Sequence, residues 1–231
     1  SPDALASARH GVVAAPLHSE APESLQGSPA AVLSTTSGAR AAIQVDGEDI
    51  ALDLPAPGLH YAVDATLAVG CVSLVSGRNL DPQIVAHSMG QSVPVFGRGE
   101  TISFKGADIA LTMMKNLPSL QANLDAMTES PELVWVAVDE GTPDPSWIYD
   151  VELGVVDHVD VLTGTKAWQW ALFLDYRGIP YGRIIEDTSE ALLEVRRMAA
   201  EKDVAVTAIV NYEQMMLIRR LAGYKELEGV R

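Results

Sequence analysis

The stretch Leu133-Val134-Trp135-Val136-Ala137-Val138 decides the fold, because all six side chains are apolar and no polar residue alternates with them. A strand with one exposed face alternates apolar and polar side chains, whereas a parallel strand covered on both faces does not. The stretch Val204–Val210 has the same mostly apolar character. The two stretches therefore predict a parallel sheet with helices on both faces.

The segments around these stretches alternate between strand and helix patterns. After Pro118 the patterns predict helix 119–127, strand 133–138, strand 159–163, helix 165–176, strand 183–186, helix 189–202, strand 205–211 and helix 213–221. This order is typical of βα units. Together with a preceding hairpin (101–104 and 109–114), it predicts an α/β, Rossmann-like domain over residues 94–231. Its functional loops should follow the carboxyl ends of the strands.

The first 93 residues have a different pattern. Strand patterns at 31–35, 41–45 and 50–54 are separated by Ser37-Gly38 and Asp46-Gly47, dipeptides that suit tight hairpin turns. An apolar helix pattern from His60 to Ser76 follows, and a second helix begins after Asp81-Pro82. We therefore expect residues 1–93 to form a separate unit, an antiparallel meander plus two helices.

Composition excludes several classes of protein. The 231 residues carry 16 Lys and Arg against 31 Asp and Glu, a formal net charge of −15, so nucleic acid is not an expected partner. No apolar stretch reaches the ~18–20 residues that span a bilayer, so no transmembrane segment is predicted. The single Cys71 excludes intramolecular disulfides and fits a reducing cytoplasm. The histidines show no metal-ligand spacing, so no metal site is predicted.

Four short motifs carry candidate functional residues. They are Gly58-Leu59-His60-Tyr61-Ala62-Val63-Asp64-Ala65, Pro94-Val95-Phe96-Gly97-Arg98-Gly99-Glu100, Met114-Lys115-Asn116 and Asp144-Pro145-Ser146-Trp147-Ile148-Tyr149-Asp150. Each also has a structural interpretation. His60 would lie in the polar first turn of a helix, Arg98 in an ordinary turn and Lys115 at a solvated strand end. Asp144 and Asp150 would belong to a capped acidic loop.

In this order the motifs resemble those of the Mur ligase family of ATP-dependent ligases. The last motif is similar to an element of the MurT-like subunit of lipid II isoglutaminyl synthase, and weaker matches at 161–164, 175–179, 184–187 and 210–212 keep the same order. The resemblance implies the C-terminal part of a Mur central domain over residues 1–93. It implies a Rossmann-like Mur ligase C-terminal domain of the MurT type over residues 94–231.

The resemblance also implies a reaction in bacterial peptidoglycan biosynthesis, and hence a role in cell shape. ATP with Mg²⁺ activates the α-carboxyl of D-glutamate in the lipid II stem peptide, and ammonia from a GatD-like glutaminase partner forms the amide. His60, Arg98, Lys115 and Asn116 would then bind nucleotide or substrate. An aspartate of this chain would orient the catalytic histidine of the partner; Asp144 is the first candidate and Asp150 the second. The protein is expected in the cytoplasm, at the inner face of the membrane through lipid II.

The sequence departs from the family in ways that keep alternatives open. Tyr61 and Asp64 replace two asparagines near the nucleotide, Leu117-Pro118-Ser119 replaces Pro-Ala-Gly, and Gly141-Thr142-Pro143 replaces Asp-Gly-Arg. A Gly-x-x-Gly-Lys-Ser/Thr phosphate loop is absent. This chain alone is therefore expected to bind no ATP and to be inactive.

Three interpretations remain open at this point. The chain begins Ser1-Pro2-Asp3 without Met, which favours a piece of a longer ligase subunit. The second interpretation is a degenerate, non-catalytic interaction module that binds a glutaminase or another partner. The third is a ligase from another Mur branch, which adds an amino acid without a glutaminase.

Overall fold

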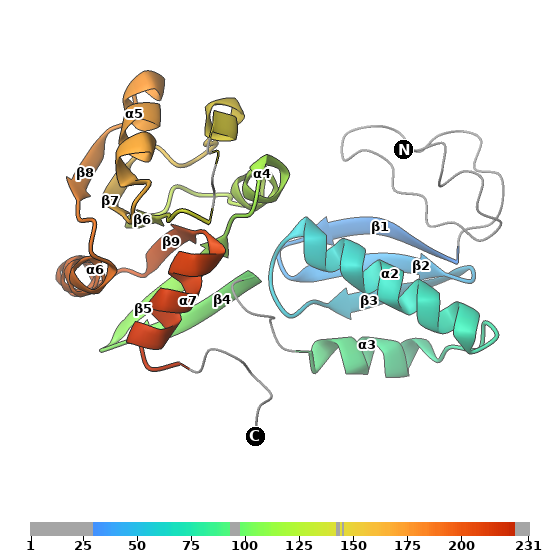
Figure 1. Ribbon diagram of the computed structural model, residues 1–231. Coiled ribbons are helices and arrows are strands. Elements are labelled where there is room, and N and C mark those ends of the chain that lie inside the picture. The colour runs from blue at the N-terminus through green and yellow to red at the C-terminus, as the bar shows by residue number, and fades with distance from the viewer. Residues whose placement is uncertain (1–29, 93–97, 142–143, 145, 225–231) are drawn as a thin grey trace. The chain divides into compact units, whose positions relative to one another are not determined.

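The structure is a computed structural model that describes residues 30–92, 98–141, 144 and 146–224, except for the side chain of Arg98 (Figure 1). The chain divides into two compact units, residues 1–93 and 94–231. The first unit contains β1 (Ala31–Ser37), β2 (Arg40–Val45), β3 (Glu48–Asp53), α2 (Leu59–Val75) and α3 (Pro82–Gly90). The second contains β4 (Arg98–Phe104), β5 (Ala107–Met113), α4 (Leu117–Asp125), β6 (Val134–Ala137), η1 (Ser146–Asp150), β7 (Val159–Thr163), α5 (Ala167–Arg177), β8 (Tyr181–Ile184), α6 (Thr188–Lys202), β9 (Val206–Val210) and α7 (Tyr212–Leu221).

The first unit is the expected antiparallel meander with two helices. β2 pairs with both β1 and β3, and Gly38 and Gly47 take the positive φ angles that its two hairpin turns require. Alternate residues of β2 and β3, including Ile43 and Leu52, are buried against the apolar face of α2. The side chain of Asp81 caps α3 by accepting from the Gln83 amide at 2.8 Å.

The second unit is a six-stranded sheet in the order β4-β5-β9-β6-β7-β8. All neighbouring strands from β5 to β8 are parallel, and β4 pairs antiparallel with β5 at one edge. The predicted hairpin is therefore the edge of the main sheet, a placement that the hairpin's local sequence does not indicate. β9, the last strand in the chain, lies between β5 and β6.

Helices cover both faces of this sheet, as the apolar strands predicted. Val134 and Val136 of β6 pack in a cluster with side chains of α4 and α5. Trp135 and Ala137 point to the opposite face, where they pack with side chains of α6 and α7. Burial on both sides explains why β6 shows no alternation of polar and apolar residues.

Most boundaries differ from the sequence prediction by one to three residues; β4, for example, begins at Arg98, three residues before the predicted start. Helix α4 begins at Leu117, two residues before the predicted start, because Asn116 caps it and Pro118 occupies its first turn, where the missing N–H of proline costs nothing. Strand β8 lies two residues earlier than predicted, at Tyr181–Ile184. Among the described residues, no helix is both long and apolar enough to cross a membrane.

Candidate functional site

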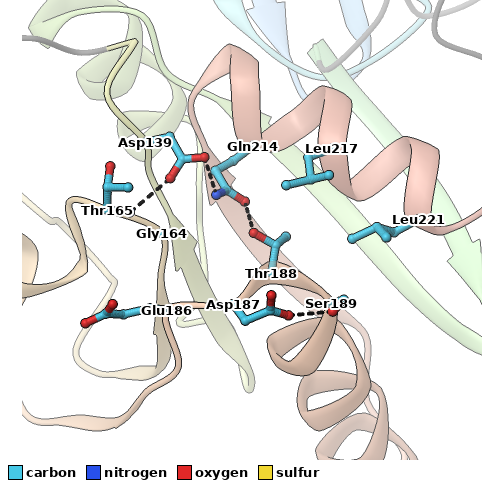
Figure 2. A pocket seen from close by; sticks show the side chains of 10 residues that line it. All are labelled: Asp139, Gly164, Thr165, Glu186, Asp187, Thr188, Ser189, Gln214, Leu217 and Leu221. Carbon is cyan, nitrogen blue, oxygen red and sulfur yellow. Dashed lines mark hydrogen bonds between the residues drawn. The ribbon is translucent and has the colours of Figure 1, made fainter.

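A crevice of about 460 Å³ lies at the carboxyl ends of the parallel strands of the second unit (Figure 2). The chain leaves the neighbouring strands β6 and β9 in opposite directions along the sheet. β6 is followed by β7, its neighbour on one side, whereas β9 is followed by α7, which packs against β5 on the other side. Such switch points are where open α/β sheets place ligands. The crevice is lined by Asp139, Gly164, Thr165, Glu186, Asp187, Thr188, Ser189, Gln214, Leu217 and Leu221.

Asp139 joins the segments that form this crevice (Figure 2). Its Oδ2 accepts a hydrogen bond from Gln214 Nε2 at 2.7 Å, and its Oδ1 accepts from the Thr165 amide at 2.9 Å. Gln214 Oε1 in turn accepts from Thr188 Oγ1 at 2.9 Å, and the Asn211 side-chain amide donates to the carbonyl of Asp139 at 3.1 Å. Because Gln214, Thr188 and Asn211 are buried, one carboxylate organises the chain after β6, β7, β8 and β9.

The turn after β7 brings the backbone close to Asp139. Gly164 has φ +89°, and a Cβ at this position would lie 2.4 Å from the Val138 carbonyl oxygen and 2.7 Å from Asp139 Oδ1. Two residues later, the buried Lys166 pairs with Glu140 at 2.9 Å, and this hydrogen bond lowers the pKa of Glu140 below its usual value. Lys166, a cation close to this turn, is therefore already paired with a carboxylate of the protein.

The crevice is acidic. Among the described residues, its lining contains the carboxylates of Asp139, Glu186 and Asp187 and no lysine or arginine. Asp187 caps α6 by accepting from the Glu190 amide at 2.9 Å, and hydrogen bonds from the Ser189 hydroxyl and this amide lower the pKa of Asp187. A helix N-terminus attracts phosphate through its amides, but here the protein's own carboxylate occupies it. The crevice therefore suits an amine or another hydrogen-bonding group better than the phosphates of ATP.

The described residues also form no cluster of three or more His, Cys, Asp or Glu side chains that would hold a metal ion.

Asp144 and Asp150 lie outside the crevice lining, on the loop and short helix after β6. Asp144 is exposed, and its Oδ1 accepts from the Ser146 amide at 2.9 Å, which lowers the pKa of Asp144. Asp150 is exposed at the end of η1. Between them, the buried Ile148 and half-buried Trp147 anchor η1 to the core. The loop thus presents two carboxylates to solvent on an anchored support.

Lys115 and Asn116 have a local explanation that the motif did not reveal. Asn116 Oδ1 accepts from the Ser119 amide at 3.0 Å, and the Asn116 amide donates to Ser119 Oγ at 3.0 Å, which together form a capping box for α4. The Lys115 amide also donates to Ser119 Oγ, while the Lys115 side chain is exposed. Asn116 therefore stabilises a helix start, and only Lys115 offers an exposed cation beside it.

His60 and Arg98 belong to different units. His60 lies in the first turn of α2, with its ring 4.7 Å from that of Tyr61. Gly58 has φ +130°, a backbone conformation that L side chains rarely adopt, and a Cβ there would lie 2.7 Å from His60 Cε1, so glycine is favoured two residues before the ring. Arg98 opens β4 opposite Thr112. Within the second unit, the crevice lining includes none of Lys115, Asn116, Asp144 and Asp150.

The residues that do form the crevice were only indirectly indicated by the sequence. The weak matches at 161–164, 184–187 and 210–212 each end a strand, and these strands prove to be parallel neighbours or near neighbours. Their common position at strand ends was the available signal. Gln214 gave no such signal, because it lies inside the predicted helix 213–221, and Thr188 falls between the match at 184–187 and the predicted helix 189–202.

Comparison of the sequence with protein-family models and with curated proteins finds no match. Solved structures do match. MurF from Acinetobacter baumannii is 19% identical with a TM-score of 0.56 over 80% of this chain and 41% of that chain. A folylpolyglutamate synthase from Mycobacterium tuberculosis, solved with ADP and AMPPCP, is 20% identical with a TM-score of 0.58 over 85% and 48%. MurC from Thermotoga maritima is 17% identical with a TM-score of 0.57 over 83% and 44%.

The chain has the fold of the Mur ligases. It spans less than half the length of each of these structures. At such low identity the likeness concerns the fold and not the substrate. The predicted fold class, a Rossmann-like Mur ligase C-terminal domain preceded by part of a Mur central domain, is confirmed.

Proposed function

We propose that this chain is part of a MurT-like subunit of an ATP-dependent amidotransferase. In this proposal residues 1–93 are a partial Mur central domain and residues 94–231 the MurT-type C-terminal domain. The complete subunit amidates the D-glutamate α-carboxyl of lipid II in the cytoplasm, with ammonia from a GatD-like glutaminase. The Mur ligase fold and the order of the motifs from His60 to Asp150 support it.

The observation that carries the proposal is the state of Asp144. This carboxylate is exposed, and one of its oxygens is oriented by the Ser146 amide. A carboxylate in this state can accept a hydrogen bond from a histidine of another chain, which fixes the histidine tautomer and stabilises the imidazolium. Asp150, exposed at the other end of η1, is the second candidate for the same role.

ATP with Mg²⁺ belongs to the proposal only for the complete subunit. When bound, ATP supplies the phosphoryl group that turns a carboxylate oxygen into a leaving group. The described residues do not form a phosphate or metal site at the crevice, so we derive no step through ATP from them. Lys115 is the exposed cation that would neutralise an anionic substrate group, and His60 and Arg98 keep their proposed contacts to nucleotide or substrate.

A second candidate function is an interaction module that binds a glutaminase without ligating anything. The acidic crevice and the use of Asn116 as a helix cap favour it, because both remove groups that would otherwise bind nucleotide. The two functions share the glutaminase partner and differ in whether lipid II is amidated.

The test combines the complete gene product with its glutaminase, glutamine, lipid II and MgATP. We expect ATP-dependent conversion of the D-glutamate carboxyl to the amide, measured by mass spectrometry, and faster glutamine hydrolysis than with the glutaminase alone. Faster hydrolysis without amidation supports the interaction module. No effect on hydrolysis and no amidation contradicts both functions.

A further inference from the structure

Helix α5 presents large apolar side chains to solvent along one line. Trp168, Leu172 and Tyr176 are 63%, 61% and 73% exposed, and their spacing of four residues places them on one face of the helix. Tyr149 of η1 extends this face, with its ring 5.7 Å from that of Tyr176. We call these four residues the α5 stripe.

The α5 stripe is unusual for a surface helix because the opposite face of α5 is apolar as well. Trp170, Phe173 and Leu174 are buried in the core against the sheet. A helix on a solvated surface carries polar residues outward, whereas a helix that is apolar all round is covered on both sides. Contiguous exposed apolar residues of this kind mark interaction surfaces.

Helix α6 packs on the same sheet and shows the ordinary pattern. Its exposed side carries Arg197, which pairs with Glu194 at 2.9 Å and with Glu201 at 2.5 Å. Leu193, 50% exposed, is the exposed large apolar residue of this helix. The difference between α5 and α6 therefore does not follow from their common place beside the sheet.

The rim of the α5 stripe is acidic. Among the described residues, five exposed carboxylates lie on η1 or α5 or contact α5 and its N-cap, and Lys166 and Arg177 are paired with two of them at 2.9 and 2.8 Å. These carboxylates are Glu140, Asp150, Glu152, Asp175 and Glu186. A surface complementary to this one has an apolar centre and a rim of lysine and arginine. A second copy of this chain would bring a second acidic rim against the first, which like-charge repulsion disfavours.

We infer that the α5 stripe is the docking surface for the glutaminase subunit, and that the glutaminase meets it with an apolar patch edged by basic side chains. The inference rests on the proposed function. Two observations connect the stripe with that function. Tyr149 lies in η1, the helix that follows Asp144, and Trp168 Nε1 donates to Glu186 Oε1 at 2.8 Å. Glu186 also lines the crevice, so a partner seated on the stripe would border both the Asp144 loop and the crevice.

The experiment measures binding of the glutaminase to the complete gene product by calorimetry, for the wild type, Leu172→Glu and Leu193→Glu. The two leucines are similarly exposed, on α5 and α6, so the second variant is a matched control. We expect Leu172→Glu to weaken binding at least about tenfold and Leu193→Glu to change it less than about twofold, with unchanged thermal melts. Wild-type affinity should fall as salt rises, because the rims carry opposite charge.

Each contrary result has a distinct meaning. If the wild type binds the glutaminase and Leu172→Glu binds equally well, the docking surface is wrong while the proposed function stands. If the wild type does not bind the glutaminase, the proposed partner and the inference both fail. If sedimentation shows wild-type dimers that Leu172→Glu abolishes, the occupant is a second copy and the inference is overturned.

Discussion

Two aspartates follow the same strand, β6, and have opposite surroundings. Asp139 accepts hydrogen bonds from the side chain of Gln214 and the amide of Thr165, and thereby ties together the strand ends of the sheet. Asp144, five residues later, is exposed, and its Oδ1 accepts from the amide of its near neighbour Ser146.

The comparison shows that carboxylates after the same strand can have different roles. One holds strand ends together, and the other is exposed to a ligand or partner, which we call an external role. Both oxygens of Asp139 accept hydrogen bonds within the fold, whereas the exposed Asp144 is accessible to a ligand or partner. The same distinction separates Asn116, which caps α4, from the exposed Lys115 beside it.

The largest expected effect is on glutamine hydrolysis by the partner. With Asp144→Asn, hydrolysis should fall by roughly 10²–10⁴-fold, because an amide neither fixes the histidine tautomer nor stabilises its cation. The thermal melt should stay within about 2 °C of the wild type. Asp150→Asn is the control. If only Asp150→Asn abolishes hydrolysis, the role moves to Asp150, and if neither variant matters, Asp144 has no external role.

The next effect is on stability. Asp139→Ala leaves the buried Gln214 side-chain amide without its acceptor, which costs about 1–3 kcal/mol, and it also removes the acceptor of the exposed Thr165 N–H, which can bond to water instead. We expect the free energy of unfolding, from urea titration, to fall by about 1–3 kcal/mol. Asp150→Ala should change it by less than about 0.5 kcal/mol. A stable Asp139→Ala protein would show that the network is not needed for the fold.

A smaller effect is expected at the helix cap. Asn116→Ala removes the side-chain acceptor of the Ser119 amide and should lower the free energy of unfolding by about 1 kcal/mol. Asn116→Ser can still cap the helix and should cost less than half of that. If Asn116→Ser is stable but weakens MgATP binding by the complete subunit, the nucleotide-binding role predicted from the motif is correct.

The smallest effect concerns pH. The Ser146 amide lowers the pKa of Asp144, so any stabilisation from this contact is present above the unfolded pKa of about 3.8 and is lost only as pH falls through the lower folded pKa. Asp144 therefore stays anionic over the working range. The ratio of glutamine hydrolysis with wild type to that with Asp144→Asn should be constant between about pH 5.5 and 8. A ratio that falls toward 1 at the acid end of this range would show that Asp144 titrates there.

Some of the site was visible in the sequence, and some was not. The apolar run 133–138 placed a buried strand, and the acids after it were recognised as candidates at a strand end. The sequence did not indicate which of these acids stabilises the fold, because the hydrogen-bond partner of Asp139 is Gln214, a residue 75 positions away. The exposed face of α5 was not visible either, since Trp168 and Trp170 look alike in a helix pattern although only Trp170 is buried.

The sequence by itself determined the elements and their class, because apolar periodicity and the turn and cap residues act over a few neighbouring positions. It also determined the acidic charge and the absence of a phosphate loop. Only the tertiary structure decided the strand order, with β9 between β5 and β6, since parallel strands pair across long separations along the chain. That order brings Asn211 and Gln214 to Asp139, which closes the crevice and leaves Asp144 outside it.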